Sequence, residues 1–307
     1  MINANAINAK EAVRRARQHG VVVPAYNIPF LPMMKPVIQA VVDENSIAMV
    51  QVARLEWNKF GSQSLEAVAQ EYNAYRDPLH TLLHLDHVPV IDEDLQEVDY
   101  LPILQRGIDA GYQSVMIDAS RLDFGGNLAA TQSAVAIAHK AGVPCEAELG
   151  AVMGHESGPA IPYDEIFATK KGFTNLQEAA RFVQESGCDW LSVAVGSVHG
   201  AVAESLKFQK KPEAKLDIAH IQALYEATGI PLVLHGGSGI KVEYIRRGIE
   251  AGIAKINVAT EIRQAYLRAL ERSPHDIPAA QEVVYRSVRE ITRDFLGVSG
   301  TRALLYP

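Results

Sequence analysis

The sequence contains few of the features that mark secreted, membrane-spanning or nucleic-acid-binding proteins. It has only two cysteines, Cys145 and Cys188, and they form no CxxC pair, so a reduced, cytoplasmic protein is expected. The first residues lack a basic segment followed by an apolar one, and no apolar run is long enough to cross a bilayer. We therefore expect neither a signal peptide nor contact with a membrane. Acidic and basic residues are mixed throughout and give a net charge of −7, which argues against nucleic acid as a partner.

Apolar residues, in contrast, make up 48% of the chain and gather in short runs rich in Val, Ile and Leu. Nearly continuous apolarity over such lengths is typical of parallel strands that are covered on both faces. Eight runs fit this description: Val21–Asn27, Ile47–Ala53, Leu82–His87, Ser114–Ala119, Pro144–Gly150, Trp190–Gly196, Pro231–Gly237 and Ala254–Thr260.

Amphipathic stretches between these runs predict helices, several with a capping residue in front and a glycine behind. Eight strand–helix units predict an α/β protein with a closed (β/α)₈ barrel in one domain, residues 1–307, and an open doubly wound sheet is the alternative. A further helix over Ala9–Gln18 could plug the barrel bottom, and helices beyond the eighth strand form a tail. The other expected helices are Pro32–Asn45, Asn127–Lys140, Asn175–Ser186, Asp217–Thr228, Lys241–Glu250, Glu261–Arg272 and Ala279–Leu296.

Three histidines lie at or just beyond the ends of strand-like runs: His87, His199 and His235. In a barrel of this type the carboxyl ends of all strands meet at one mouth. A histidine taken alone is more often structural, so the shared position of the three carries the argument. Three neutral imidazoles at one mouth predict a site for Zn²⁺ or a related borderline metal, with open positions for a substrate.

Carboxylates and amides occur at the same strand ends. Asp86 adjoins His87 and could exchange a proton with the hydroxyl of a metal-bound substrate. Glu146 and Glu148 are two residues apart, so they point to the same side of the sheet, although a salt-bridge network inside the barrel would explain Glu146 equally well. Asn27 and Asp118 end the first and fourth strands.

The last two strands end in the segments Gly236-Gly237-Ser238-Gly239 and Asn257-Val258-Ala259-Thr260. Glycines let backbone amides approach a ligand, and the hydroxyls of serine and threonine add donors. The loops after strands seven and eight are where barrels commonly bind phosphate. A glycine turn by itself is a weak signal, but this one follows His235 and so favours a phosphate site.

Six segments together resemble the class II, metal-dependent ketose-bisphosphate aldolases, which include fructose- and tagatose-bisphosphate enzymes. They run in the family order and cover nearly the whole barrel, which makes them specific in combination. The segments are Leu83–His87 (LHLDH), Gly111–Ser120 (GYQSVMIDAS), Glu146–Gly150 (EAELG), Gly196–Gly200 (GSVHG), Pro231–Gly239 (PLVLHGGSG) and Lys255–Glu261 (KINVATE).

The resemblance implies a role for each candidate residue. Asp86 exchanges a proton with the hydroxyl whose carbon leaves as an aldehyde, and Glu156, in the long loop after strand five, is the mobile acid–base residue. Asn27 corresponds to an active-site asparagine. The implied metal ligands are His87, His199 and His235, with Asp118 and Glu148 at a second or displaced ion. The implied cradle for the phosphate of dihydroxyacetone phosphate is Gly200, Gly236, Gly237, Ser238, Asn257, Val258, Ala259 and Thr260.

The end of strand two departs from the family, which usually places a serine or threonine there toward the far end of the ketose. Here Arg54 follows the strand, and an arginine can bind a carboxylate, phosphate or sulfonate with paired donors. The alternative is that Arg54 turns outward and pairs with Glu56 or another surface acid. Ala259 is similar to the tagatose branch, because many fructose enzymes have aspartate there.

These observations predict a zinc-dependent aldolase that reversibly cleaves a phosphorylated ketose to dihydroxyacetone phosphate and an aldehyde. One alternative is an aldolase for a ketose monophosphate or an acidic sugar. Another is a non-catalytic companion subunit, which would have no need for Asp86, the three histidines and Glu156. The family also implies a homo-oligomer, a dimer or larger, with the helical tail at the interface.

Overall fold

The computed structural model describes residues 7–150, 163–197, 215–237 and 239–307. Eight parallel strands close into a barrel in which each strand pairs with its neighbour in sequence and β8 pairs with β1. The predicted (β/α)₈ barrel is thereby confirmed, and the open sheet is excluded. Each expected apolar run coincides with one strand. The strands are β1 (Val23–Asn27), β2 (Ala48–Ala53), β3 (Thr81–Pro89), β4 (Ser114–Asp118), β5 (Cys145–Leu149), β6 (Trp190–Val193), β7 (Leu232–Leu234) and β8 (Ile253–Val258).

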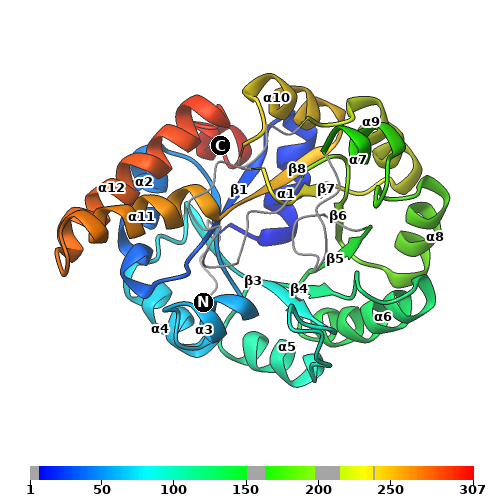
Figure 1. Cartoon of the computed structure of the whole chain (residues 1–307), viewed down its shortest axis with the longest axis horizontal. Coiled ribbons are helices and arrows are strands. Elements are labelled where there is room, and N and C mark those ends of the chain that lie inside the picture. The colour runs from blue at the N-terminus through cyan, green and yellow to red at the C-terminus, as the bar shows by residue number, and fades with distance from the viewer. Residues whose placement is uncertain (1–6, 151–162, 198–214, 238) are drawn as a thin grey trace.

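Helices surround the barrel on all sides (Figure 1). Some begin and end as their sequences predict: Asn175 and Asp217 cap helices with their side chains, and Gly187 and Gly229 end the same helices in the left-handed conformation. The longer helices are α2 (Met34–Asp43), α4 (Leu65–Tyr75), α5 (Tyr100–Asp109), α6 (Phe124–Lys140), α8 (Leu176–Ser186), α9 (Ile218–Thr228), α10 (Val242–Ala251), α11 (Thr260–Arg272) and α12 (Ile277–Glu290). The short ones are η1 (Leu31–Met33), α3 (Arg54–Lys59), α7 (Tyr163–Thr169), the π-helical turn Ile291–Phe295 and α13 (Thr301–Leu305).

Helix α1 (Ala9–His19) closes the amino-terminal end of the barrel, as predicted. Its apolar face, which includes Ala12, Val13 and Ala16, packs with inward-facing residues at the starts of the strands, such as Val23 and Leu82. Figure 1 shows α1 crossing behind the strands at the centre of the ring. The opposite, carboxyl-terminal end is therefore the mouth that remains for a site.

The tail begins with α11 and α12, which pack against each other, and α12 also packs on α2 (Figure 1). At that contact the Gln281 side chain donates to the carbonyl of Pro32, and Arg289 pairs with Glu44 at 2.6 Å. These two helices therefore extend the outer ring of the barrel beside its first helix.

Inward-facing positions change from apolar to polar along each strand. In β2 the inward series runs from Met49 to Gln51, and in β3 it runs from Leu82 through His84 to Asp86. The apolar members pack on α1, and the polar members lie toward the mouth. Alternation therefore gathers polar groups from separate strands at one end of the barrel without exposing the core.

Among the residues described, no helix is long and apolar enough to cross a membrane. Both cysteines are buried and neither forms a disulfide bond.

Candidate active site and metal centre

The third strand contains an irregularity that turns two neighbouring side chains to the same place. Its pairing with β4 shifts register between Leu85 and Val88, and His87 has a φ of 31°. Successive residues of a regular strand point to opposite faces of the sheet. The bulge removes that alternation, so both Asp86 and His87 reach the mouth. A positive φ is costly for a residue with a β-carbon, and strain of this kind is typical of functional sites.

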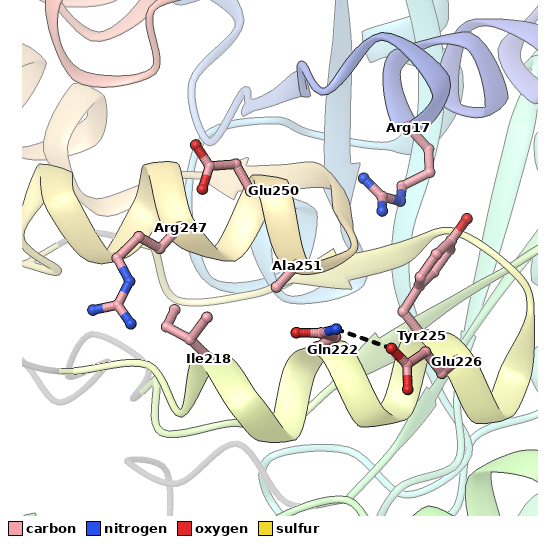
Figure 2. Close-up of a pocket in the computed structure, with 8 residues that line it drawn as sticks. All are labelled: Arg17, Ile218, Gln222, Tyr225, Glu226, Arg247, Glu250 and Ala251. Carbon is pink, nitrogen blue, oxygen red and sulfur yellow. Dashed lines mark hydrogen bonds between the residues drawn. The ribbon is translucent and has the colours of Figure 1, made fainter.

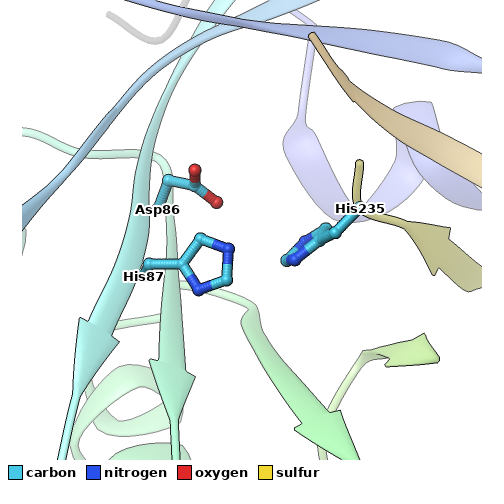
Figure 3. A group of neighbouring side chains, drawn as sticks. All are labelled: Asp86, His87 and His235. Carbon is cyan, nitrogen blue, oxygen red and sulfur yellow. The ribbon is translucent and has the colours of Figure 1, made fainter. Parts of the chain in front are cut away.

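His235, just beyond β7, completes a cluster with these two residues (Figure 3). One ligand atom each from Asp86, His87 and His235 lies within 4.8 Å of the other two, and the two imidazole centroids are 4.5 Å apart. Asp86 and His235 are buried, and His87 is partly exposed. The structure thus brings together two of the three predicted histidine ligands and the neighbouring carboxylate.

A second group shares His87 and adds two carboxylates, Asp118 and Glu148, again with ligand atoms within 4.8 Å of one another. The Nδ1 atom of His87 lies 3.0 Å from Asp118 and 4.0 Å from Glu148. A carboxylate that accepts from one imidazole nitrogen fixes the tautomer and ring orientation, which is the usual arrangement behind a metal-binding histidine. Asp118 and Glu148 therefore can orient His87 or serve a second ion.

The electrostatics of the cluster favour a cation. Burial lowers the pKa of His87, but Asp86, Asp118 and Glu148 outweigh burial and raise it to about 10. Burial and His87 lower the pKa of His235, and its contacts with Glu146 and Glu148 reverse the direction. A field that favours a proton on these imidazoles also favours a divalent ion between them. Imidazole nitrogens and carboxylate oxygens are ligands of zinc-type ions, so the residues fit a metal.

Asp86 is held by three amide side chains from three other strands. Asn27 and Gln51 donate to Oδ2 at 3.0 and 3.1 Å, and Asn257 donates to Oδ1 at 3.0 Å. Burial raises the pKa of Asp86, but His87 and Lys255 lower it by more, so the carboxyl group stays ionised. A fixed, ionised carboxylate is equipped to accept a proton.

Glu146 forms the salt-bridge network that the sequence left open as its alternative role. Its carboxylate accepts from Trp190 Nε1 at 2.6 Å, pairs with Lys255 at 2.9 Å and lies 3.0 Å from Nε2 of His235. Glu148 contacts the other nitrogen, Nδ1, at 3.1 Å. The two carboxylates do point to the same side of the sheet, as their spacing predicts, and together they hold the ring of His235.

The predicted phosphate cradle lies beside this cluster. Gly236 has a φ of 67°, and a β-carbon on Gly237 would come within 2.9 Å of Ile256 on β8, so both positions require glycine. Asn257 links the end of β8 to Asp86, and Val258 is buried. Ala259 is the N-cap of α11 and Thr260 is its first residue, so α11 points its amino-terminal end toward the mouth.

Arg54 forms an ion pair with a buried acid. Its Nη1 atom donates to Asp92, in the loop after β3, at 3.1 Å, and a fifth of the side chain is exposed. Glu56, which the sequence offered as a possible partner, instead turns inward and is buried. Four other predicted residues, His199, Gly200, Glu156 and Ser238, lie outside the described residues.

Four buried polar residues near the mouth do not follow from the sequence argument: Gln51, Lys255, Glu56 and Arg263. Gln51 could have been predicted from the alternation of side chains along a strand, because it lies two residues after Met49 and so faces inward with it. Lys255 lies in β8 with its ammonium group between Glu146 and the Asn257 side chain. Glu56 and Arg263 lie on α3 and α11, where charged residues ordinarily face water.

A separate cavity of about 340 Å³ lies between α1, α9 and α10 (Figure 2). Arg17 stacks over the ring of Tyr225 at 4.2 Å on one side of it, and Arg247 lies at the other end. None of the candidate residues that the structure describes lines this cavity, so it is distinct from the cluster at the mouth.

Comparison with known proteins agrees with the fold. The family model for class II fructose-bisphosphate aldolase matches residues 7–300, nearly the whole chain. The chain therefore belongs to the class II fructose-bisphosphate aldolase family, whose members are carbon–carbon lyases. The resemblance drawn from the six sequence segments is confirmed.

Solved structures of aldolases superimpose along nearly the full length. A candidate fructose-1,6-bisphosphate aldolase from Coccidioides immitis has a TM-score of 0.76 at 26% identity, with 98% of this chain and 99% of the other covered. The YdjI aldolase of Escherichia coli K12 has a TM-score of 0.75 at 24% identity, covering 97% and 99%. Fructose-bisphosphate aldolase from Campylobacter jejuni gives 0.71 at 16% identity, covering 97% and 98%. For the E. coli and C. jejuni structures, which are only 24% and 16% identical to this chain, the likeness shows the fold alone.

Proposed function

We propose that this protein is a zinc-dependent aldolase that cleaves a phosphorylated ketose to dihydroxyacetone phosphate and an aldehyde, and runs the reverse condensation. The observation that carries the proposal is the cluster of Asp86, His87 and His235, with ligand atoms within 4.8 Å at the barrel mouth. Membership of the aldolase family supplies the reaction class.

In this proposal His87, His199 and His235 hold the catalytic ion, and Asp118 and Glu148 serve a second or displaced position. When bound, a zinc ion supplies Lewis-acid polarisation of the ketose carbonyl. The contacts of His235 Nε2 with Glu146 and of His87 Nδ1 with Asp118 support this assignment, because each fixes an imidazole ring through one nitrogen and the other nitrogen can then bind the ion.

Asp86 takes the proton from the C4 hydroxyl as the C3–C4 bond breaks and C4 leaves as the aldehyde. Its three amide donors support this role because they orient the carboxylate, and His87 and Lys255 lower its pKa so that the group stays ionised. Glu156 then delivers a proton to C3, a role that rests on the family resemblance alone. In the condensation direction both transfers run in reverse.

The dihydroxyacetone phosphate half is bound by the glycine turn after β7 and the amino-terminal end of α11, with Gly200 and Ser238 as further members. The close packing of Gly237 on β8 supports this assignment, since a β-carbon there would come within 2.9 Å of Ile256 and displace the turn whose backbone amides would meet the phosphate. We assign Asn27 to the substrate hydroxyls near Asp86.

The first test is condensation of dihydroxyacetone phosphate with a panel of aldehydes that differ in length and charge. We expect turnover that chelation abolishes and that Zn²⁺ or Co²⁺ restores, with product cleavage in the reverse direction. A protein that condenses no aldehyde at any metal concentration, or that is fully active when metal-free, would overturn the proposal.

A further inference from the structure

The cavity between α1, α9 and α10 contains an arginine whose charge no described acid neutralises. Arg17 extends into the cavity from α1, and its Nη1 atom makes only a long contact, 3.4 Å, with the carbonyl of Ile249. Its Nε atom is buried and has no hydrogen-bond partner in the described part of the chain. Donors in this state are costly, and the planar guanidinium matches the oxygens of a carboxylate or phosphate.

Stacking holds the guanidinium group of Arg17 in one orientation. The group lies 4.2 Å from the ring centroid of Tyr225 on α9 (Figure 2). Tyr225 is itself fixed by close packing, because a β-carbon on Gly252, which ends α10, would come within 2.7 Å of the tyrosine side chain. A donor that is already ordered loses less conformational entropy when it binds an anion.

A second arginine lies at the opposite end of the cavity. Figure 2 shows Arg247, from α10, beside Ile218 at the start of α9. Arg247 is exposed, and no acid among the described residues pairs with it. Ile218 and Tyr225 are seven residues apart on α9, so the two ends of the cavity are on the order of 10 Å apart at 1.5 Å per residue. The cavity therefore offers one cation at each end.

Hydrogen-bond acceptors line the cavity between these ends. Gln222 and Glu250 lie between the two arginines in Figure 2. Gln222 uses its amide nitrogen to bind Glu226 at 2.9 Å, so its carbonyl oxygen remains available as an acceptor. Carboxylates accept from hydroxyl groups and repel anions, which favours a ligand that has hydroxyls in the middle and negative charge only at its ends.

The length and volume of the cavity narrow the choice of ligand. Three bonds of an extended chain span about 3.3–3.6 Å, so the nine bonds between the phosphorus atoms of a six-carbon sugar bisphosphate reach about 10 Å. The cavity volume of about 340 Å³ lies within the range of small-molecule sites, roughly 300–1,000 Å³. A six-carbon dicarboxylate, in contrast, is too short to contact both arginines.

We propose that this cavity is a second binding site, for a sugar bisphosphate, with one phosphate on Arg17 and the other on Arg247. The sugar hydroxyls donate to Gln222 and Glu250. The ligand binds away from the barrel mouth, between the two helices that precede and follow β7 in the chain. This inference is independent of the proposed aldolase function.

The test is calorimetric titration of the zinc-loaded protein with glucose 1,6-bisphosphate, which has no ketose carbonyl to cleave. Dihydroxyacetone phosphate is present at saturation to occupy the barrel mouth, and the titration is repeated without it. We expect one equivalent of the bisphosphate to bind with the same affinity in both titrations. Glucose 6-phosphate and glucarate should bind more weakly, and glucose and inorganic phosphate should give no detectable heat.

Arginine variants assign the binding to the cavity. Arg17→Met and Arg247→Met should each weaken binding of the bisphosphate by about 10- to 100-fold, the range for a hydrogen bond to a charged group. Matched changes at exposed positions of the same helices, Arg14→Met on α1 and Arg246→Met on α10, should leave the affinity within about threefold. Because Arg247 is exposed, its replacement should not affect folding, and circular dichroism checks this for each variant.

Three results would overturn the inference. If dihydroxyacetone phosphate abolishes binding of the bisphosphate, the sugar binds at the barrel mouth. If the control variants weaken binding as much as Arg17→Met and Arg247→Met, the effect is one of overall charge. Tighter binding of glucarate than of the bisphosphate would show that the cavity does not bind phosphates at both ends.

Discussion

Asp86 and His87 are neighbours in sequence that serve one site, and they do so because β3 is irregular between them. The register shift and the positive φ of His87 let the carboxylate and the imidazole face the same space. The two residues are expected to have separable functions, with His87 holding the ion and Asp86 moving a proton. This division can be tested because only one of the two should matter for metal content.

We predict that Asp86→Ala retains its zinc but lowers turnover by roughly 10² or more, the scale of a positioned proton-transfer group. The variant should still exchange the C3 proton of dihydroxyacetone phosphate with solvent, because that transfer is assigned to Glu156. Elemental analysis, steady-state kinetics and exchange followed by NMR give the three readouts. Loss of zinc in this variant would instead make Asp86 a ligand.

Glu56 provides a prediction for the pH dependence of stability. The unfolded chain loses the Glu56 proton near pH 4.5, whereas burial holds the folded pKa at about 8. Between these values the unfolded state binds fewer protons, so the free energy of unfolding falls as pH rises. The charged groups that face Glu56 are Asp86 from β3, which raises its pKa, and Arg263 from α11, which lowers it.

We therefore expect wild type to lose stability relative to Glu56→Gln as pH rises from about 5 to 8, by at most about 1.4 kcal/mol for each unit of pKa shift. Denaturant midpoints of both proteins at several pH values measure the difference. Parallel pH profiles for the two proteins would show that Glu56 is ionised in the fold.

At this scale the sequence predicts those site residues that end apolar strands, because strand ends share one mouth in a barrel. Asp86, His87 and His235 are of this kind, and the structure brings them together. Glu56 and Arg263 could not be predicted, because a charged residue in an amphipathic helix is ordinarily solvated. Their burial depends on how α3 and α11 pack over the barrel, which no local pattern specifies.

Among the elements, α1 illustrates a segment whose position follows from its pattern. Small apolar residues on one face predict a helix that packs closely, and Val13 is fully buried against the starts of the strands. The short helix α3 is the opposite case. Its sequence, RLEWNK, has no repeated apolar face, and the helix begins directly after β2.

Since α1 lies at the end of the barrel opposite the site, its packing should affect stability and not chemistry. We predict that Val13→Ala lowers the free energy of unfolding by about 1–3 kcal/mol through lost burial and a small cavity. Zinc content and kcat should stay at wild-type values. Arg14→Ala, a change at an exposed position of the same helix, should cost no more than about 0.5 kcal/mol. Denaturant unfolding and steady-state kinetics on both variants test this prediction. A large loss of kcat in Val13→Ala would show that the packing of α1 affects catalysis as well as stability.

For the whole molecule, the alternation of eight apolar runs with amphipathic helices is sufficient to predict the closed barrel. Parallel strands that are buried on both faces are compatible with few other folds. The carboxyl ends of the strands then define the mouth. Along each strand the inward-facing residues change from apolar, where they pack on α1, to polar, where they lie at the mouth. The substrate could not be predicted in the same way. The helices that follow β2 and β8 contribute Glu56 and Arg263, and the burial of these two residues differs from what their sequences alone indicate.

The central claim is that His87 and His235, beside the carboxylate of Asp86, help to hold a divalent ion that activates dihydroxyacetone phosphate. The most direct measurement is exchange of the C3 proton of dihydroxyacetone phosphate in D₂O, followed by NMR without any aldehyde. We predict exchange with the zinc-loaded protein, none after chelation, recovery when zinc is returned, and none with His235→Ala at any zinc concentration. Exchange at the wild-type rate in metal-free protein or in His235→Ala would contradict the account.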